Sequence, residues 1–162
     1  METMPPATLV ALAETVAFET EPQAVYAAVA QAADDLIGHK LCTIMAFDAG
    51  AMRVRRVFSS NVADYPPGDA KDKRGTAWGQ LVLEQGKPYI GRTAEDIRAN
   101  FDDHELIARL GLESILNVPV RRLGRVVGTM NLLNVAGFYS ERDLAWGRAL
   151  AAVLAGIIEK PD

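Results

Sequence analysis

The spacing of apolar residues near the amino terminus predicts two helices. Residues 7–18 are rich in alanine and leucine, which favours a first helix. A second helix is expected over residues 20–37, because Thr20-Glu-Pro-Gln23 has the pattern of a capping box with proline in the first turn. The apolar positions of this helix recur at helical spacing, at Val25, Val29, Ala32, Ala33 and Leu36. One face of the second helix is therefore expected to pack on a sheet.

Apolar runs with strand-forming residues predict that sheet. Residues 41–47 are apolar on both alternating faces, which indicates an interior strand, whereas the arginines within 52–60 indicate a more exposed one. Residues 114–120 and 126–133 read as a hairpin whose turn is supplied by Gly124. Adjacent strands joined by short turns predict antiparallel pairing.

The middle of the chain is less regular. Residues 61–74 contain Pro66-Pro67-Gly68 with acidic and basic neighbours, which predicts a long mobile loop. A short helix over 75–84, a short strand over 88–91 and another short helix over 102–110 are expected to follow. The last helix is expected to start at the capping box Ser140-Glu-Arg-Asp143. Its apolar stripe comprises Leu150, Val153, Leu154, Ile157 and Ile158. Together the elements predict the α+β class.

Length and composition limit the chain to one globular domain. Its 162 residues suffice for one core, with 49% apolar and 23% charged residues. We expect a single domain over 1–162, with an N-terminal helix in 1–19 and the core in 20–160. The longest apolar run, 149–158, is about half of a membrane span. The amino terminus also lacks the basic start of a secretory signal, so a cytoplasmic location and no membrane partner are expected.

Charge and cysteine content exclude further classes. A net charge of −4 argues against a large nucleic-acid footprint. The basic residues are local, and we expect them to be solvated strand-edge and loop charges rather than an anion or partner site. They fall in three groups: Arg53, Arg55 and Arg56; Lys71, Lys73 and Arg74; and Arg121, Arg122 and Arg125. The single cysteine, Cys42, excludes an intrachain disulfide and a cysteine-based metal cluster.

The stretch from Leu110 to Asp143 carries a family resemblance. Leu110-Gly-Leu-Glu-Ser-Ile-Leu-Asn-Val-Pro-Val120, Arg125-Val-Val-Gly-Thr-Met-Asn-Leu-Leu-Asn134 and Gly137-Phe-Tyr-Ser-Glu-Arg-Asp143 resemble the carboxyl-terminal half of a GAF domain, a small ligand-sensing module. The upstream elements agree with this resemblance. It implies the GAF-like fold, related to PAS and profilin-like folds, with terminal helices on one face of the sheet. On the other face it implies a ligand pocket under short helices and loops.

The resemblance extends to an enzyme, the free methionine-(R)-sulfoxide reductase, whose middle segment is similar to residues 101–120. That enzyme needs one thiolate to attack sulfur and a second thiol to resolve the product. Here residues 75–79 occupy its first cysteine region and residues 107–109 its second, and neither contains cysteine. Cys42 is expected to be buried and inert. The sequence therefore predicts no cysteine-based catalysis.

Two further ligand classes of the resembled family need particular residues. A bilin needs a suitably placed cysteine, and a haem needs an axial ligand, for which only His39 and His104 exist. We expect His39 to meet the carbonyls at a helix end and His104 to be a surface histidine, with contact to a ligand as the alternative. The cyclic-nucleotide motif is incomplete, because valine replaces its lysine in Asn134-Val135, with Phe138 and Glu141 or Asp143 following. No metal and no specific cofactor are predicted.

What remains is a pocket for a small molecule of unknown identity. Polar residues on apolar strands and near the middle segment are the candidates to line it. They are Thr76, Trp78, Tyr89, Arg92, His104, Ser114, Asn117, Thr129 and Asn131. The helix start around Thr76, next to Arg74, is an alternative place for an anion.

The resemblance implies a small-molecule-binding sensory or regulatory domain without catalysis. Such a domain passes its signal through a homodimer or another partner, and the apolar terminal helices favour a homodimer. One alternative is an enzyme that uses His104 with Asp102, Asp103 or Glu105 as acid and base. Another is a ligand-free interaction module whose pocket is filled by its own side chains.

Overall fold

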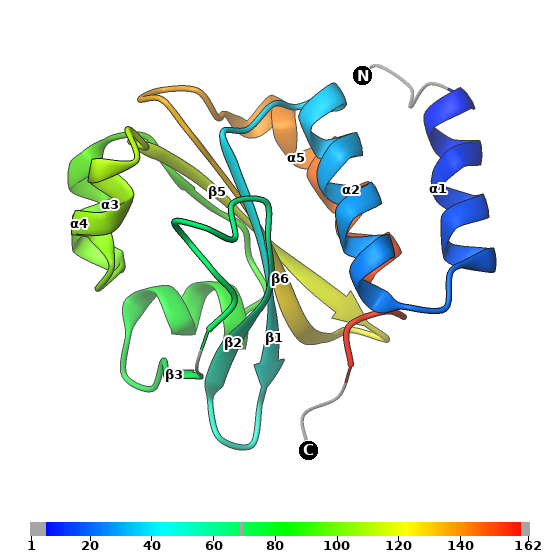
Figure 1. Ribbon diagram of the computed structural model, residues 1–162. Coiled ribbons are helices and arrows are strands. Elements are labelled where there is room, and N and C mark those ends of the chain that lie inside the picture. Colours follow the sequence, from blue (N-terminus) through cyan, green and yellow to red (C-terminus); the bar gives the residue numbers. More distant parts are fainter. Residues whose placement is uncertain (1–5, 69, 160–162) are drawn as a thin grey trace.

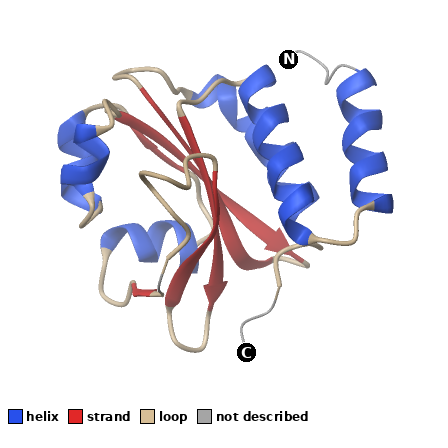
Figure 2. Cartoon of the chain, viewed as in Figure 1, coloured by secondary structure: helices blue, strands red, loops and turns tan. Residues whose placement is uncertain are grey.

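The computed structural model describes residues 6–68 and 70–159, whose strands form one six-stranded antiparallel sheet (Figures 1 and 2). The strand order is β3-β2-β1-β6-β5-β4. The pairing follows from the tight turns predicted between β1 and β2 and between β5 and β6. The strands are β1 (Leu41–Asp48), β2 (Arg53–Ser59), β3 (Lys71–Asp72), β4 (Tyr89–Gly91), β5 (Ser114–Arg122) and β6 (Arg125–Asn134).

Helices lie on both sides of this sheet. The longer helices lie on one side, and the short ones lie on the other (Figure 2). On the first side are α1 (Pro6–Phe18), α2 (Pro22–Leu36) and α5 (Leu144–Leu154), the last preceded by η2 (Glu141–Asp143). On the second are η1 (Gly79–Glu84), α3 (Ala94–Asn100) and α4 (His104–Arg109). The predicted α+β architecture is confirmed. None of the described helices is long and apolar enough to cross a bilayer.

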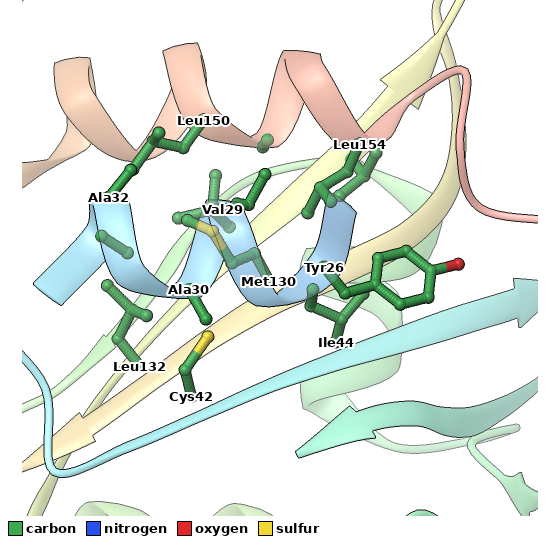
Figure 3. Close-up of a cluster of buried hydrophobic side chains, with 14 of the residues drawn as sticks. Tyr26, Val29, Ala30, Ala32, Cys42, Ile44, Met130, Leu132, Leu150 and Leu154 are labelled. Atoms are coloured by element: carbon green, nitrogen blue, oxygen red, sulfur yellow. The ribbon is translucent and has the colours of Figure 1, made fainter. Parts of the chain in front are cut away.

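The main core lies between the sheet and the helices α2 and α5 (Figure 3). Val29, Leu132 and Leu154 have no exposed surface, and each comes from a different element. Cys42 points into this core from β1, as predicted for an interior strand. Because side chains alternate along a strand, its neighbour Thr43 faces the opposite side of the sheet, where the short helices lie. The sheet thus separates an apolar core from a second, more polar layer.

The two terminal helices differ in their surroundings. Helix α5 lies on the sheet, and Leu150 and Leu154 are fully buried there. Helix α1 instead packs on α2, on the side away from the strands (Figure 1). Leu12 makes this contact and is 4% exposed. The remaining large apolar side chains of α1 are exposed: Leu9, Val10, Val16 and Phe18.

The amino-terminal cap of α2 differs from the prediction. Glu21 rather than Thr20 occupies the cap position, and its side chain makes no capping hydrogen bond. Pro22 fixes the first helical residue, so Thr20 lies one residue too early to cap. The Gln23 side chain instead donates to the Val57 carbonyl oxygen at 2.8 Å, which ties α2 to β2. The capping box at Ser140 and Asp143 is confirmed, with both of its hydrogen bonds present.

The middle of the chain is more ordered than predicted. Within the expected loop, β3 pairs with β2 as an edge strand. Helix α3 was not expected, although Thr93 and Asp96 form a capping box at its start. Helix α3 contacts β4 and β5, and α4 packs on α3. They form one wall of the layer that holds the candidate site.

Candidate functional site

A small pocket lies on the sheet face opposite to α2 and α5. Its volume is about 40 Å³, whereas one water molecule needs only about 10–15 Å³ of such space. In this conformation the pocket has room for a few waters or for a group as small as a carboxylate. The pocket is lined by Thr43, Met45, Val54, Arg56, Tyr65, Lys71, Lys73, Phe101, Asp103, Ile107, Ile115, Asn117, Asn131 and Leu133.

A chain of buried hydrogen bonds forms its floor. The Trp78 indole Nε1 donates to Asn117 Oδ1 at 3.0 Å, and Asn117 Nδ2 donates to Asn131 Oδ1 at 2.7 Å. Asn131 Nδ2 then donates to the hydroxyl of Thr43 at 3.1 Å. The chain crosses β5, β6 and β1 side by side, because Asn117 pairs with Asn131 and Asn131 with Thr43 in the strand register. Each donor fixes the orientation of the next amide, so the polar floor is held rigidly.

Among the residues that the structure describes, Asp103 supplies the only carboxylate in the pocket lining. The Asp103 carboxylate accepts a hydrogen bond from the Tyr65 hydroxyl and lies 3.5 Å from Arg56 Nη2. Lys71 Nζ lies 3.7 Å from the same oxygen. The guanidinium of Arg56 also stacks on the Tyr65 ring, 3.7 Å from its centroid, and donates to the Pro66 carbonyl oxygen. These contacts join the segment 61–74 to the start of α4. Burial and the neighbouring carboxylate raise the pKa of Tyr65, which therefore stays a neutral donor.

Lys73 is the unusual charge of the site. Its residue is only 7% exposed. Within the described residues its ammonium has no carboxylate oxygen within 4.0 Å and no hydrogen-bond acceptor. It lies over two aromatic rings instead, 5.3 Å from the Trp78 centroid and 5.9 Å from that of Phe101. Burial lowers the pKa of Lys73. A buried lysine without an anionic partner is rare, because desolvation disfavours its charged form.

Two candidates named from the sequence, Asn117 and Asn131, line the pocket. Trp78 lies directly behind them as the donor to Asn117 and is 2% exposed. Together with Thr43, these three residues form the floor network. The polar groups that the sequence singled out on apolar strands thus lie in the floor of this pocket, and their contact with a ligand stays a prediction.

Three other candidates are engaged in structural hydrogen bonds. The Thr76 hydroxyl donates to the Lys73 carbonyl oxygen and accepts from Gly79 N–H, as a local turn. The Ser114 hydroxyl donates to the Val135 carbonyl oxygen at 2.6 Å. Arg92 pairs with Glu141 at 3.2 Å, away from the pocket. Arg74 pairs with Asp72 at 2.9 Å, so the arginine beside Thr76 already has an anionic partner.

The remaining candidates lie outside the pocket lining. The Tyr89 hydroxyl accepts from Asn100 Nδ2 at 2.9 Å, which joins β4 to α3. Thr129 is fully buried, and its hydroxyl has no hydrogen-bond partner in the described part of the chain. His104 begins α4 and is half-buried. Its neighbour Asp103, considered from the sequence only as a partner for His104, is the residue that enters the pocket.

The expectation of solvated basic residues is wrong for two of them. The Arg56 side chain is 16% exposed and Lys73 is nearly buried. Arg56 faces inward because it follows Val54 by two positions, and both side chains lie on the pocket face of β2. Val54 is apolar and buried. The two-residue spacing from Val54 to Arg56 could therefore have predicted that both side chains face the same side of β2. The burial of Lys73 depends on Trp78 and Phe101 and had no local signal.

The described residues offer little redox or metal chemistry. Burial raises the pKa of the Cys42 thiol to about 12, with a further contribution from Asp34, so the thiolate is not formed near neutral pH. Across 6–68 and 70–159, no group of three or more histidine, cysteine, aspartate or glutamate side chains could hold a metal ion. His39 Nε2 lies 2.8 Å from the Ala30 carbonyl oxygen of α2, so it contacts a helix carbonyl as predicted, although Ala30 is not among the last carbonyls of the helix.

Residues at the positions of the cyclic-nucleotide motif also serve the fold. Asn134 Oδ1 accepts from the Val135 N–H at 2.8 Å, and Asp143 accepts from the Ser140 N–H at 2.9 Å. Glu141 is held by Arg92. None of these three side chains lines the pocket.

An antiparallel sheet with long helices on one face and a small pocket above an amide floor on the other defines an α+β domain. The chain belongs to the GAF domain family, which it matches over residues 19–159. The comparison with curated proteins gave no match.

Solved structures support the same fold. The GAF domain of a phosphoenolpyruvate-protein phosphotransferase from Acinetobacter is 19% identical, with a TM-score of 0.75 over 98% of this chain and 94% of that one. A GAF domain of a sensor histidine kinase from Bacillus halodurans is 19% identical, with a TM-score of 0.67 over 82% and 90%. The free methionine-R-sulfoxide reductase from Neisseria meningitidis, solved with its substrate, is 16% identical, with a TM-score of 0.70 over 93% and 86%.

Proposed function

We propose that this domain is a non-catalytic sensory module that binds a small molecule in the pocket above the amide floor. The observation that carries the proposal is the buried charge at this pocket. A purely structural layer is stabilised by apolar contacts, whereas Arg56 and Lys73 are desolvated here at a cost to folding. Binding sites accept such costs because the same groups then recognise a ligand.

Proteins with a similar structure support this proposal. Similar structures come from a phosphoenolpyruvate-protein phosphotransferase, a two-component sensor histidine kinase and a methyl-accepting chemotaxis protein. The Neisseria enzyme, built on the same fold, was solved with a bound substrate. A domain of this shape can therefore hold a small polar molecule.

A catalytic role has less support from the site. Sulfoxide reduction requires an accessible thiolate, and Cys42 lies in the core on the other face of the sheet. Acid–base chemistry by His104 requires its imidazole within hydrogen-bond reach of a bound substrate, and His104 does not line the pocket.

Ligand binding should stabilise the protein and slow hydrogen exchange in the segments that close the pocket. We expect a bound metabolite to raise the melting temperature, because it binds only the folded state. We also expect slower hydrogen exchange within the segment 61–103, most strongly in 61–68 and 70–74, whose contacts close the pocket. A thermal-shift screen of a library containing neutral, cationic and anionic metabolites, followed by hydrogen exchange on each hit, measures both effects.

Helix α1 is the internal control for this experiment, because it lies on the other side of the sheet. Its exchange should not change beyond the general gain in stability. A library without a single stabilising compound, or hits that protect only surfaces away from the pocket, would contradict the proposed function. It would then favour the module whose pocket is filled by its own side chains.

We further propose that the signal leaves through a homodimer formed by α1. Leu9 is 55% exposed and Phe18 is 82% exposed, although α1 already uses Leu12 to pack on α2. Such an apolar surface is typical of a partner site. A twofold contact would cover it with an identical surface. Helix α5 is not available for this contact, because it is buried against the sheet.

The double variant Leu9→Glu with Val16→Glu should be monomeric. These two positions are seven residues apart, so they lie on the same side of α1, and both are exposed in one chain. Sedimentation at micromolar concentration should show a dimer for the parent and a monomer for the variant. Leu123→Glu, at the fully exposed turn between β5 and β6, is the matched control and should remain dimeric. A monomeric parent or an unchanged double variant would remove α1 as the interface.

A further inference from the structure

Basic side chains outnumber carboxylates in the lining of the pocket, and Asp102 and Asp103 act on Lys73 only from beyond 4.0 Å. Three basic side chains and one carboxylate line the pocket: Arg56, Lys71, Lys73 and Asp103. Asp103 lies within 4.0 Å of Arg56 and Lys71, but the charge of Lys73 is not matched by any described carboxylate at that distance. Arg56 Nε is also buried without an acceptor within the described residues. The site therefore has unused cationic and donor groups in a poorly solvated place.

Asp103 shows which chemistry these groups accept. Its carboxylate receives one hydroxyl donor and two cations at a single oxygen, Oδ2. It reaches them from the start of α4, whereas Arg56, Tyr65 and Lys71 come from β2, the following segment and β3. Side chains from three parts of the chain thus converge on one carboxylate at the start of a fourth, and the free space beside it suits another small group. Charge-assisted hydrogen bonds of this kind are about twice as strong as neutral ones.

We propose that the ligand of this pocket is a small organic carboxylate, which binds to Lys73, Arg56 and Lys71 in competition with Asp103. This inference rests on the proposed function and specifies its ligand class. The Asp103 carboxylate occupies the cation cluster in the unliganded protein. An incoming carboxylate takes over these contacts and also pairs with Lys73. The amide floor then lies beneath the ligand as a fixed polar surface.

Competition between the ligand and Asp103 links ligand binding to a change in the contacts that hold the start of α4. The contacts of Asp103 with Tyr65, Arg56 and Lys71 hold the segment 61–74 to α4. When a ligand replaces Asp103, these contacts pass to the ligand, and α4 is released from that segment. The ligand is thereby coupled to the position of α4, which provides a way to transmit binding.

The experiment uses succinate as the carboxylate probe, succinamide as its neutral analogue and inorganic phosphate as a different anion. Titrations followed by amide NMR report both affinity and location on the intact chain. We expect succinate to bind saturably and to shift the signals of Tyr65, Lys73 and Asp103, whereas succinamide does not bind. Asp103→Asn removes the internal competitor and keeps the side-chain shape, so succinate should bind at least about 10-fold more tightly to it.

Substitutions of the cations should act in the opposite direction. Lys73→Met should weaken succinate binding by at least about 10-fold, because the ligand loses an ion pair in a poorly solvated site. Lys71→Gln, at a side chain that is 41% exposed, is a second variant that leaves the buried layer intact and should also weaken binding. Lys40→Met replaces an exposed lysine outside the pocket lining and is the matched control, with unchanged affinity.

Each contrary result has a distinct meaning. Equal binding of succinamide, or binding of phosphate without succinate, would overturn the assignment to carboxylates. Weaker succinate binding by Asp103→Asn would show that Asp103 supports the ligand rather than competes with it, which also overturns the proposal. If neutral or cationic metabolites bind in the pocket and succinate does not, the carboxylate assignment fails while the proposed sensory function stands. If neither the library nor succinate binds, both fail.

Discussion

Replacing Asn131 with leucine is expected to lower the free energy of unfolding by about 3 kcal/mol. Asn131 is the middle of the floor network, where its Oδ1 accepts from Asn117 and its Nδ2 donates to Thr43. Leucine of similar size would leave a buried amide donor and a buried hydroxyl without their partners. Each such group costs about 1–3 kcal/mol, and the added apolar contact offsets only part of this.

Chemical denaturation at neutral pH, with the denaturant dependence fitted together with the midpoint, measures this loss. The double variant Asn117→Leu with Asn131→Leu is the control, because it removes both members of the central hydrogen bond. It should cost less than the sum of the two single variants, by about 1–2 kcal/mol. Additive costs would show that the two amides do not act as one network.

Apolar runs explain why so much of the fold could be predicted from the sequence. Strands β1, β5 and β6 are largely apolar and carry the side chains that face α2 and α5, so these runs indicated where the strands lie. The β5–β6 turn follows local rules, since Leu123 and Gly124 both have positive φ angles, 51° and 83°, as a tight hairpin requires. Elements defined by such local periodicity and turn chemistry were recovered with boundaries close to those observed.

Helix α3 and the cap of α2 show where local patterns were misread. Thr93 and Asp96 form a capping box with aspartate in the place of the usual glutamate or glutamine. At α2 the pattern beginning at Thr20 looked complete, but Pro22 set the first helical residue and moved the cap to Glu21. In both cases the decisive signal lies within four residues of sequence, so a stricter reading of the caps would have found it.

The residues of the candidate site could be predicted only in part, because some of them come together only in the folded chain. Asn117 and Asn131 were recognisable because polar side chains interrupt apolar strands there. Lys73 and Asp103 lie in irregular segments that meet only in the folded chain. Their burial results from tertiary contacts with Phe101, Trp78 and Tyr65, which no local pattern encodes. A charge in a loop is usually solvated, and that expectation was wrong for Lys73, which is 7% exposed.

Lys73→Met should stabilise the protein while it weakens succinate binding. Methionine is similar in length, keeps the contacts with Trp78 and Phe101, and needs no hydration. Removal of the desolvated charge is expected to raise the free energy of unfolding by about 1 kcal/mol at neutral pH. The gain is modest because the cation–π contacts of the ammonium with the two rings are lost.

The pH dependence identifies the charge of Lys73 as the cause. Burial lowers the pKa of Lys73 below its usual 10.5, against opposing contributions from Asp102 and Asp103. Between the lowered pKa and 10.5 the unfolded chain binds more protons at this lysine than the folded protein does. The stability contributed by this group therefore rises with pH in that window. Buried tyrosines such as Tyr65, whose pKa is raised, oppose this trend, but they are common to both proteins.

The quantity to measure is thus the difference in unfolding free energy between Lys73→Met and the parent. It should favour the variant at pH 7 and become smaller as the pH approaches 10.5, because the parent lysine then loses the charge that made its burial costly. Lys40→Met, which removes an exposed lysine, should show no such convergence. A variant that is less stable than the parent at pH 7 would mean that the ammonium is satisfied in the unliganded protein. The buried cation would then be part of the fold, and not a group held ready for a ligand.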